Sequence, residues 1–120
     1  MTGAVADTSA FEVFLNPLAQ LRKGTTALAV LAGLERGEVY GYGLRRDVHR
    51  KTKGIFGLNE GALYPLLHSL ERRGLVRVRR EKVRGRWRKY YRITARGRRD
   101  LVRRRRDWEH LRQVLDGLRK

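Results

Sequence analysis

The chain has 120 residues, contains no cysteine and carries a formal net charge of +17. This length allows one domain with a modest core, and the lack of cysteine excludes a disulfide framework and a thiolate metal site. An excess of positive charge on this scale predicts a polyanionic partner.

The positive charge is concentrated between Arg77 and Arg106, where sixteen Lys or Arg residues stand against two acids. This density favours a nucleic acid as the partner. An anionic membrane surface and a merely basic, solvated surface are the alternatives. No segment has the roughly 20 apolar residues that cross a bilayer, and the first ten residues do not have the pattern of a signal peptide. We therefore expect a cytoplasmic protein without a membrane partner.

The N-terminal region, residues 1–20, is expected to be a partly mobile arm. Residues 1–9 are small and polar, which favours mobility. Asn16 and Pro17 suit a helix start, because Asn caps the first turn and proline at the first position has no amide to leave unpaired. We predict a short helix that follows them.

Two further helices precede the centre of the chain. The first is predicted over Thr26–Arg36 by an apolar stripe that ends at Gly37. Residues 39–43 read as a glycine-aromatic turn, and the second helix is predicted at about residues 42–52. Its inward residues are Leu44 and Val48, whereas Arg45 and Arg46 face outward and suit a phosphate backbone.

Residues 59–73 predict the helix around which the chain is organised. Asn59 suits the N-cap and Gly74 a left-handed C-terminal stop. Its expected inward face consists of Ala62, Leu63, Leu66, Leu67 and Leu70. Its outward face is compact and polar, which suits a DNA groove, and contains Glu60, Gly61, Tyr64, His68 and Arg72. Tyr64 either meets DNA or packs on the hairpin that follows, and Pro65 removes one backbone hydrogen bond.

After Gly74 the spacing of the apolar residues changes from the helical period to the alternation that is typical of a β-hairpin. Val76 and Val78 lie on one predicted strand and Tyr91 and Ile93 on the other, and the polar loop between them covers residues 81–89. Around Gly85, Arg84 and Arg86 suit a narrow minor groove, or else form a solvated tip. Trp87 either packs against Arg88 or contacts sugar-phosphate.

Thr94 is expected to cap a last helix that reaches about Leu118. Apolar residues recur along it with heptad spacing, at Leu101, Trp108, Leu111, Leu115 and Leu118. Arg104 stands at a position where the heptad pattern would have an apolar residue, and Asp100 or Asp107 can pair with it there. This pattern predicts a dimerisation helix, and the alternative is a helix folded back on its own domain. Trp108 suits the interface core or stacking on a planar ligand.

Catalysis is not indicated. The three histidines lie on separate predicted elements, and the sequence has neither a phosphate-binding loop nor a dinucleotide fingerprint. We expect no enzyme activity, no cofactor and no metal. The serious alternative to a specific DNA-binding protein is a non-specific basic protein of chromatin or RNA.

The predicted order of three helices, strand, basic loop and strand is that of a winged helix-turn-helix. The expected fold class is mainly α with a small β-hairpin (α+β), completed by a long C-terminal helix. The chain resembles the short form of the PadR-like transcriptional regulators of prokaryotes, on Leu21-Arg22-Lys23-Gly24-Thr25, Gly41-Tyr42, Gly61-Ala62-Leu63-Tyr64-Pro65-Leu66-Leu67, Leu70-Glu71, Gly74-Leu75, Gly85, Lys89-Tyr90-Tyr91-Arg92-Ile93-Thr94 and Gly97. It departs from them at Trp87, where the family often has proline, and at Ala62, where it often has threonine.

The resemblance implies a homodimer formed by the C-terminal helices, a palindromic operator, a repressor role and, in some members, release by a small aromatic or cationic ligand near the dimer interface. It implies a cytoplasmic protein that joins the nucleoid when bound to DNA. It also implies an arm over residues 1–20, a DNA-binding domain over 21–94 and a dimerisation helix over 95–120. The expected DNA-facing residues are Arg45, Arg46, Asn59, Glu60, Gly61, Tyr64, His68, Arg72, Arg84, Gly85, Arg86, Arg88 and Lys89, and the expected ligand or dimer residues are Leu101, Trp108, Leu111, Leu115 and Leu118.

Overall fold

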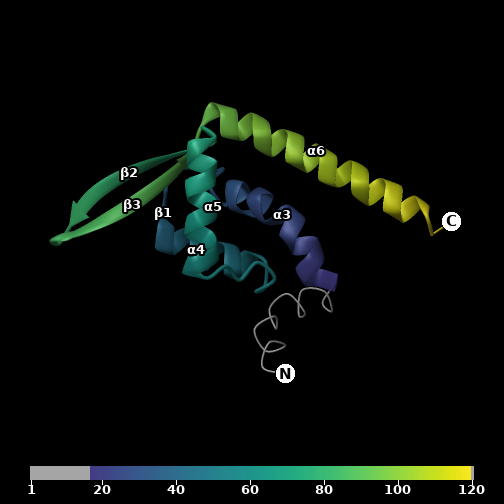
Figure 1. Cartoon of the computed structure of the whole chain (residues 1–120), viewed down its shortest axis with the longest axis horizontal. Helices are drawn as coiled ribbons and strands as arrows, with labels where there is room; N and C mark the ends of the chain where they lie inside the picture. Colours follow the sequence, from purple (N-terminus) through teal and green to yellow (C-terminus); the bar gives the residue numbers. More distant parts are fainter. Residues whose placement is uncertain (1–16, 120) are drawn as a thin grey trace, which may run out of the picture.

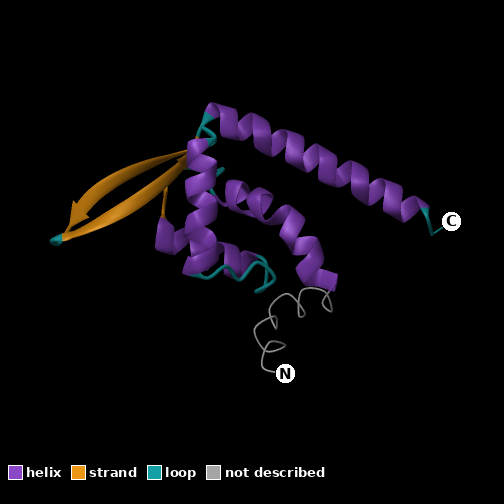
Figure 2. Ribbon diagram, viewed as in Figure 1, coloured by secondary structure: helices purple, strands orange, loops and turns teal. Residues whose placement is uncertain are grey.

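The computed structural model describes residues 17–119, so the expectations for residues 1–16 lie outside the described part of the chain. Three helices form a compact body, from which a β-hairpin projects to one side and a long helix to the other (Figures 1 and 2). The elements are α3 (Pro17–Gly33), β1 (Val39–Tyr40), α4 (Gly41–Lys51), α5 (Glu60–Arg72), β2 (Val76–Val83), β3 (Arg86–Ile93) and α6 (Ala95–Gly117). Within the described residues, no helix combines the length and apolar character that crossing a membrane requires.

A single leucine-rich core joins the helices. Leu31, Leu44, Leu63 and Leu67 have no exposed surface, and they come from α3, α4 and α5. Leu101 of α6 belongs to the same cluster. The first turns of α6 are therefore part of the domain core, and only its distal part is free of it.

Helix α3 differs from the prediction in its middle and at its C-terminal end. It begins at Pro17 as expected, but it continues through Gly24, where the sequence suggested a break. Thr26 donates its hydroxyl to the Arg22 carbonyl at 2.7 Å, a bond to residue i−4 that a continuous helix accommodates. The helix ends at Gly33 instead of Arg36, because Leu34 and the two residues after it form tighter turns before Gly37, whose φ is +141°.

Helix α5 closely matches its prediction. The Asn59 side chain accepts a hydrogen bond from the Ala62 amide at 2.9 Å, and Gly74 has a φ of +75°. The prediction that Ala62 faces inward is wrong: its position on the helix is 100° from Leu63 and outside the buried arc, so Ala62 is exposed.

Replacing Asn59 by alanine is expected to destabilise the protein by about 1 kcal/mol, because the cap oxygen accepts the Ala62 amide at 2.9 Å, and without it this amide keeps the Asn59 carbonyl at 3.1 Å. Urea unfolding without DNA measures this change. Asn59→Asp keeps a capping oxygen and should retain the stability of the parent protein, and an equal loss in both variants would refute the cap.

The β2–β3 hairpin, which we call the wing, has longer strands and a tighter turn than the sequence predicted. Its ladder runs from Val76 opposite Ile93 to Val83 opposite Arg86, which leaves only two residues for the turn. These residues, Arg84 and Gly85, have φ values of +51° and +78°. Two successive positive φ values match the twist of a hairpin, so pairing continues to the tip. The expected loop over residues 81–89 is therefore wrong.

A third strand completes the sheet in the order β1-β3-β2, all antiparallel. Val39 pairs with Tyr91 and Tyr40 with Tyr90, so the predicted glycine-aromatic turn is a short strand that leads directly into α4. This pairing fixes the base of the wing against α4.

Helix α6 begins as predicted, with the Thr94 hydroxyl accepting a hydrogen bond from the Gly97 amide at 2.9 Å. Leu101, expected in the dimer seam, is instead buried in the core of its own chain, because α6 packs along α3 there. Asp100 pairs with Arg104 at 2.5 Å, which is one of the two pairings of Arg104 that the sequence predicted. A two-bond fork between Arg105 and Glu35 joins α6 to the end of α3, and this hydrogen bonding lowers the pKa of the Glu35 carboxyl.

Candidate nucleic-acid interface

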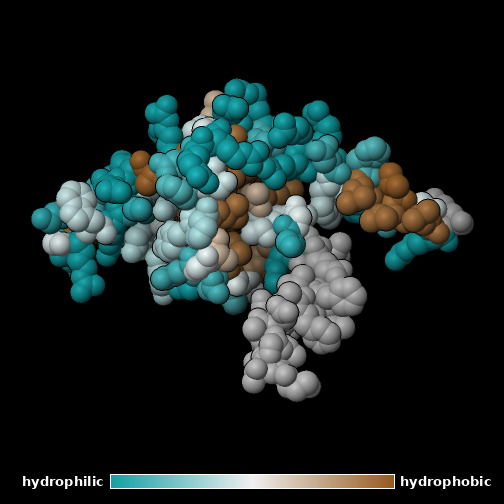
Figure 3. Space-filling model, in the orientation of Figure 1, coloured by the Kyte–Doolittle hydropathy of each residue, from teal (hydrophilic) through white to brown (hydrophobic). Residues whose placement is uncertain are grey.

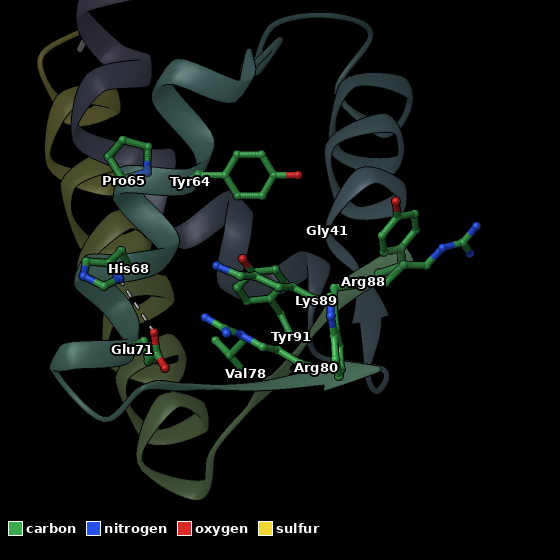
Figure 4. Close-up of a pocket in the computed structure, with 12 residues that line it drawn as sticks. Gly41, Tyr64, Pro65, His68, Glu71, Val78, Arg80, Arg88, Lys89 and Tyr91 are labelled. Atoms are coloured by element: carbon green, nitrogen blue, oxygen red, sulfur yellow. Dashed lines mark ion pairs between the residues drawn. The ribbon is translucent and has the colours of Figure 1, made fainter. Parts of the chain in front are cut away.

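A wide cleft separates α5 from the wing (Figure 4). Its volume is about 1270 Å³. Helix α5 lines it with Tyr64, Pro65, His68 and Glu71, and the sheet lines it with Tyr40, Val78, Arg80, Trp87, Arg88, Lys89 and Tyr91. The cleft therefore has apolar and aromatic groups at its base and cations along the wing.

Tyr64 lies at the base of this cleft. A Cβ atom on Gly41 would lie 3.3 Å from the Tyr64 hydroxyl and 3.1 Å from the Tyr91 ring, so the glycine lets both tyrosines approach the start of α4. Tyr64 still exposes 37% of its surface to the cleft. Its partial burial raises the pKa of its hydroxyl, which therefore remains a neutral donor near pH 7.

The other expected DNA-facing residues of α5 are accessible. Glu60, Gly61, His68 and Arg72 are all exposed, and His68 lies 3.8 Å from the Glu71 carboxylate. Asn59 is partly committed, since its side-chain oxygen caps the helix. Only its side-chain nitrogen is left to donate to DNA.

The expected basic residues of the wing fall into two groups. Arg84, Arg86 and Lys89 are exposed, whereas Arg88 is half-buried with its guanidinium 5.0 Å from the centre of the Tyr40 ring. At the wing base, Arg79 pairs with Glu38 at 2.7 Å. Of the expected residues, Arg84, Arg86 and Lys89 thus offer their charges at the tip and along the cleft, whereas Arg79 at the base is paired with Glu38.

A tyrosine row at the wing base was missed by the sequence analysis. The Tyr40 ring lies 5.7 Å from Tyr90 and 6.4 Å from Tyr42, between ring centres. Arg45 and Arg46 each approach the face of Tyr42. In the sequence, this row is marked by tyrosines at alternate positions beside a glycine. No pattern along the sequence shows that residue 40 lies next to residue 90.

Two further basic hollows lie at the two ends of α5. The hollow at the start of α5 is lined by Arg45, Arg46, Asp47, His49, Arg50, Gly57, Leu58 and Asn59. The hollow at the opposite end of α5 has a volume of about 780 Å³ and is also basic. Figure 3 shows hydrophilic surface over the wing and the first half of α6.

Among the described residues, no group of three His, Cys, Asp or Glu side chains suits a metal ion.

Comparisons with known proteins agree with this geometry. Residues 30–103 match the model of the transcriptional regulator PadR-like family. The chain is 35% identical over 99 residues to the transcriptional regulator Rv3488 of Mycobacterium tuberculosis, which covers 82% of this chain and 90% of that protein. Its structure is similar to that of a PadR family transcriptional regulator from Eggerthella lenta, with a TM-score of 0.77, 30% identity and coverage of 98% of this chain and 96% of that one.

A transcriptional regulator from Clostridium thermocellum is similar as well, with a TM-score of 0.76, 26% identity and coverage of 84% of this chain and 99% of that one. The family match spans more than half of the 120 residues and includes α4, α5 and the whole wing. The chain therefore belongs to the PadR-like family, and it is a DNA-binding regulator of transcription and not an enzyme.

Proposed function

We propose that the protein represses transcription by binding a palindromic operator as a homodimer. The observation that carries this proposal is an apolar stripe on the distal part of α6, which we call the distal stripe: Trp108, Leu111, Leu115 and Leu118. These side chains are 48–79% exposed in the single chain, and Figure 3 shows hydrophobic surface at this end of the molecule. Exposed apolar residues that share one helix face mark an interaction surface.

In this proposal α5 enters the major groove with Glu60, Gly61, Tyr64 and His68 facing the bases or the sugar-phosphate backbone. The wing tip, with Arg84, Gly85 and Arg86, reaches the adjacent minor groove. Phosphates are held by Arg45, Arg46, Arg72, Arg88 and Lys89, with help from the Asn59 amide. Since the exposed face of α5 has few long donors, most of the binding free energy comes from these cations and α5 supplies the register.

Replacing Arg86 by alanine is expected to make the dependence of log affinity on log salt shallower by about one unit for each protomer, with base preference kept. The reason is that an exposed arginine at a phosphate releases one counterion when it binds. Titrations from about 50 to 200 mM salt measure the slope. Arg119→Ala, at the far end of α6, should leave it unchanged, and an unchanged slope for Arg86→Ala would remove the wing tip from the interface.

A smaller cavity supports an effector site. It has a volume of about 480 Å³ and is lined by Thr25, Leu28, Ala29, Phe56, Arg105, Trp108 and Glu109. We propose that a small aromatic or cationic ligand stacks on Trp108 there and releases the operator. The cavity adjoins the distal stripe, so a ligand in it would alter the same surface that joins the protomers.

Footprinting tests the proposed function. A dimeric operator-binding protein should protect one defined site with two half-sites about 34 Å apart. A reporter driven by this site should rise when the protein is removed. Near-equal affinity for unrelated DNA and RNA would favour the non-specific alternative, and a specific-to-non-specific ratio of about 1,000 or more would exclude it.

A further inference from the structure

The basic hollow at the C-terminal end of α5 enters the interface described so far only through Arg72. Five arginines converge on it: one from α5, one from the turn that follows α5 and three from α6. We call it the arginine pocket, and its lining consists of Arg72, Arg73, Arg96, Arg99 and Arg103, with Asp100 and the backbone of Gly74 and Leu75.

Positive charge in the arginine pocket is not neutralised within the described part of the chain. Asp100 is only 8% exposed, and its two carboxylate oxygens are already occupied by Arg103 and Arg104, both at 2.5 Å. The other four arginines make no hydrogen bond or ion pair among the described side chains. Like charges gathered in this way repel one another unless an anion lies between them. The pocket therefore favours an anionic ligand, and guanidinium groups suit phosphate.

The backbone under the arginine pocket is held by local bonds. Thr94 donates its hydroxyl to the Gly74 carbonyl at 2.7 Å and its amide to the Leu75 carbonyl at 3.0 Å. The same hydroxyl caps α6 through the Gly97 amide. Two helices thus present their arginines from a fixed junction, in contrast to a run of arginines along one solvated helix.

The arginine pocket and the basic hollow lined by Arg45, Arg46 and Arg50 lie at opposite ends of α5. Figure 1 shows α4 beside one end of α5 and the start of α6 beside the other. With 13 residues α5 is about 20 Å long, whereas the major groove is about 12 Å wide. A helix of this length that spans the groove brings each of its ends to one of the two bordering phosphate strands.

We propose that the arginine pocket binds backbone phosphates of the strand that borders the major groove at the C-terminal end of α5, while the α4 arginines hold the opposite strand. This inference rests on the proposed function, in which α5 occupies the groove. It adds Arg73, Arg96, Arg99 and Arg103 to the DNA interface. It also gives α6 a second role besides dimerisation, because three of these four arginines lie on its first turns.

The test is the double variant Arg96→Gln/Arg99→Gln with operator DNA. Both side chains are exposed, so the fold should be kept. The salt slope is expected to become shallower by about 1.8 for each protomer, since each lost phosphate contact changes it by about 0.9. Ethylation interference should disappear at phosphates of one strand in each half-site, with base preference kept. Arg96→Lys/Arg99→Lys retains the charge and should retain most of the slope.

The control is Arg112→Gln/Arg119→Gln, which removes two arginines from the distal end of α6, one of them paired with Glu109 and Asp116. Its slope should equal that of the parent protein. If the Arg96→Gln/Arg99→Gln slope and interference are unchanged while the parent binds one defined site, the inference is overturned and the proposed function stands. If the parent has no preferred site, the proposed function fails, and the slope on arbitrary DNA still tests the pocket.

Two further measurements separate other outcomes. Inorganic tripolyphosphate that binds the parent but not the glutamine variant, with the DNA slope unchanged, would assign the pocket to a free anion and overturn the DNA assignment. If the double variant does not fold, Arg73→Gln alone tests the same site. Arg73 is exposed, and its expected loss of slope is about 0.9 for each protomer.

Discussion

Replacing Leu111 and Leu115 by aspartate is expected to convert the protein from a dimer to a monomer and to abolish tight operator binding. Both side chains are about half-exposed in the single chain, at 54% and 50%, so neither supports the monomer core. The folded monomer should therefore persist, and light scattering together with circular dichroism would show a folded particle of half the mass.

The expected size of this effect follows from burial. A leucine buried at an interface contributes about 1.5–3 kcal/mol, and a symmetric dimer buries the two leucines from each protomer. Because each side chain is already about half covered in the single chain, the loss is about half of that for full burial, roughly 3–6 kcal/mol, before the repulsion between the new carboxylates is added. Without the dimer, each α5 binds its half-site alone, and the gain from a linked second site is lost. Operator titrations should show this loss as a fall of about 100-fold or more in affinity.

Val102→Asp is the matched control, since Val102 is 53% exposed on the same helix. At 100° for each residue, it lies about 160° around α6 from the centre of the distal stripe. It should leave the dimer intact. A dimer that survives the Leu111 and Leu115 substitutions would place the protomer interface elsewhere in the chain.

The elements that could be predicted from the sequence are those with local end signals. Asn59 and Thr94 cap their helices and Gly74 ends α5, and each acts through bonds within a few residues. The wing was predicted with strands that were too short. Its distal residues are mostly polar, and Val83 and Trp87 do not form a regular apolar alternation, so only the conformation of Arg84 and Gly85 shows where the turn lies.

The sequence was enough to predict the composition of the candidate site, but not how its residues are arranged in space. The basic residues of α4 and the wing stand out in the sequence, and the structure places most of them on the surface. The arginine pocket unites residues 72–73 with residues 96–103, and periodicity within one element cannot reveal such a convergence. The prediction that Leu101 lies in the dimer seam was wrong for the same reason. Its heptad position suits a seam, but the packing of α6 against α3 decides where the side chain lies.

Replacing Gly97 by alanine is expected to destabilise the protein by about 3 kcal/mol, a value near the upper end for overpacking. A Cβ atom at Gly97 would overlap the Leu75 carbonyl oxygen and lie 2.7 Å from Cγ1 of Ile93. The carbonyl is backbone at the junction of α5 and β2, and it already accepts the Thr94 amide, so it cannot turn aside as a flexible side chain can. Thermal unfolding should show a fall of roughly 10 °C.

Gly24→Ala is the control for this substitution. Gly24 also lies inside a helix, but no described atom comes within 4 Å of an added Cβ. Alanine there should stabilise the protein by about 0.5–1 kcal/mol, because glycine is the poorer helix former. Equal behaviour of the two variants would show that the contact at Leu75 does not constrain α6. If the contact does constrain it, Gly97 sets the direction of α6 relative to α5. In the proposed dimer that direction fixes the spacing of the two half-sites, so any folded Gly97→Ala protein should bind its operator more weakly than its stability alone explains.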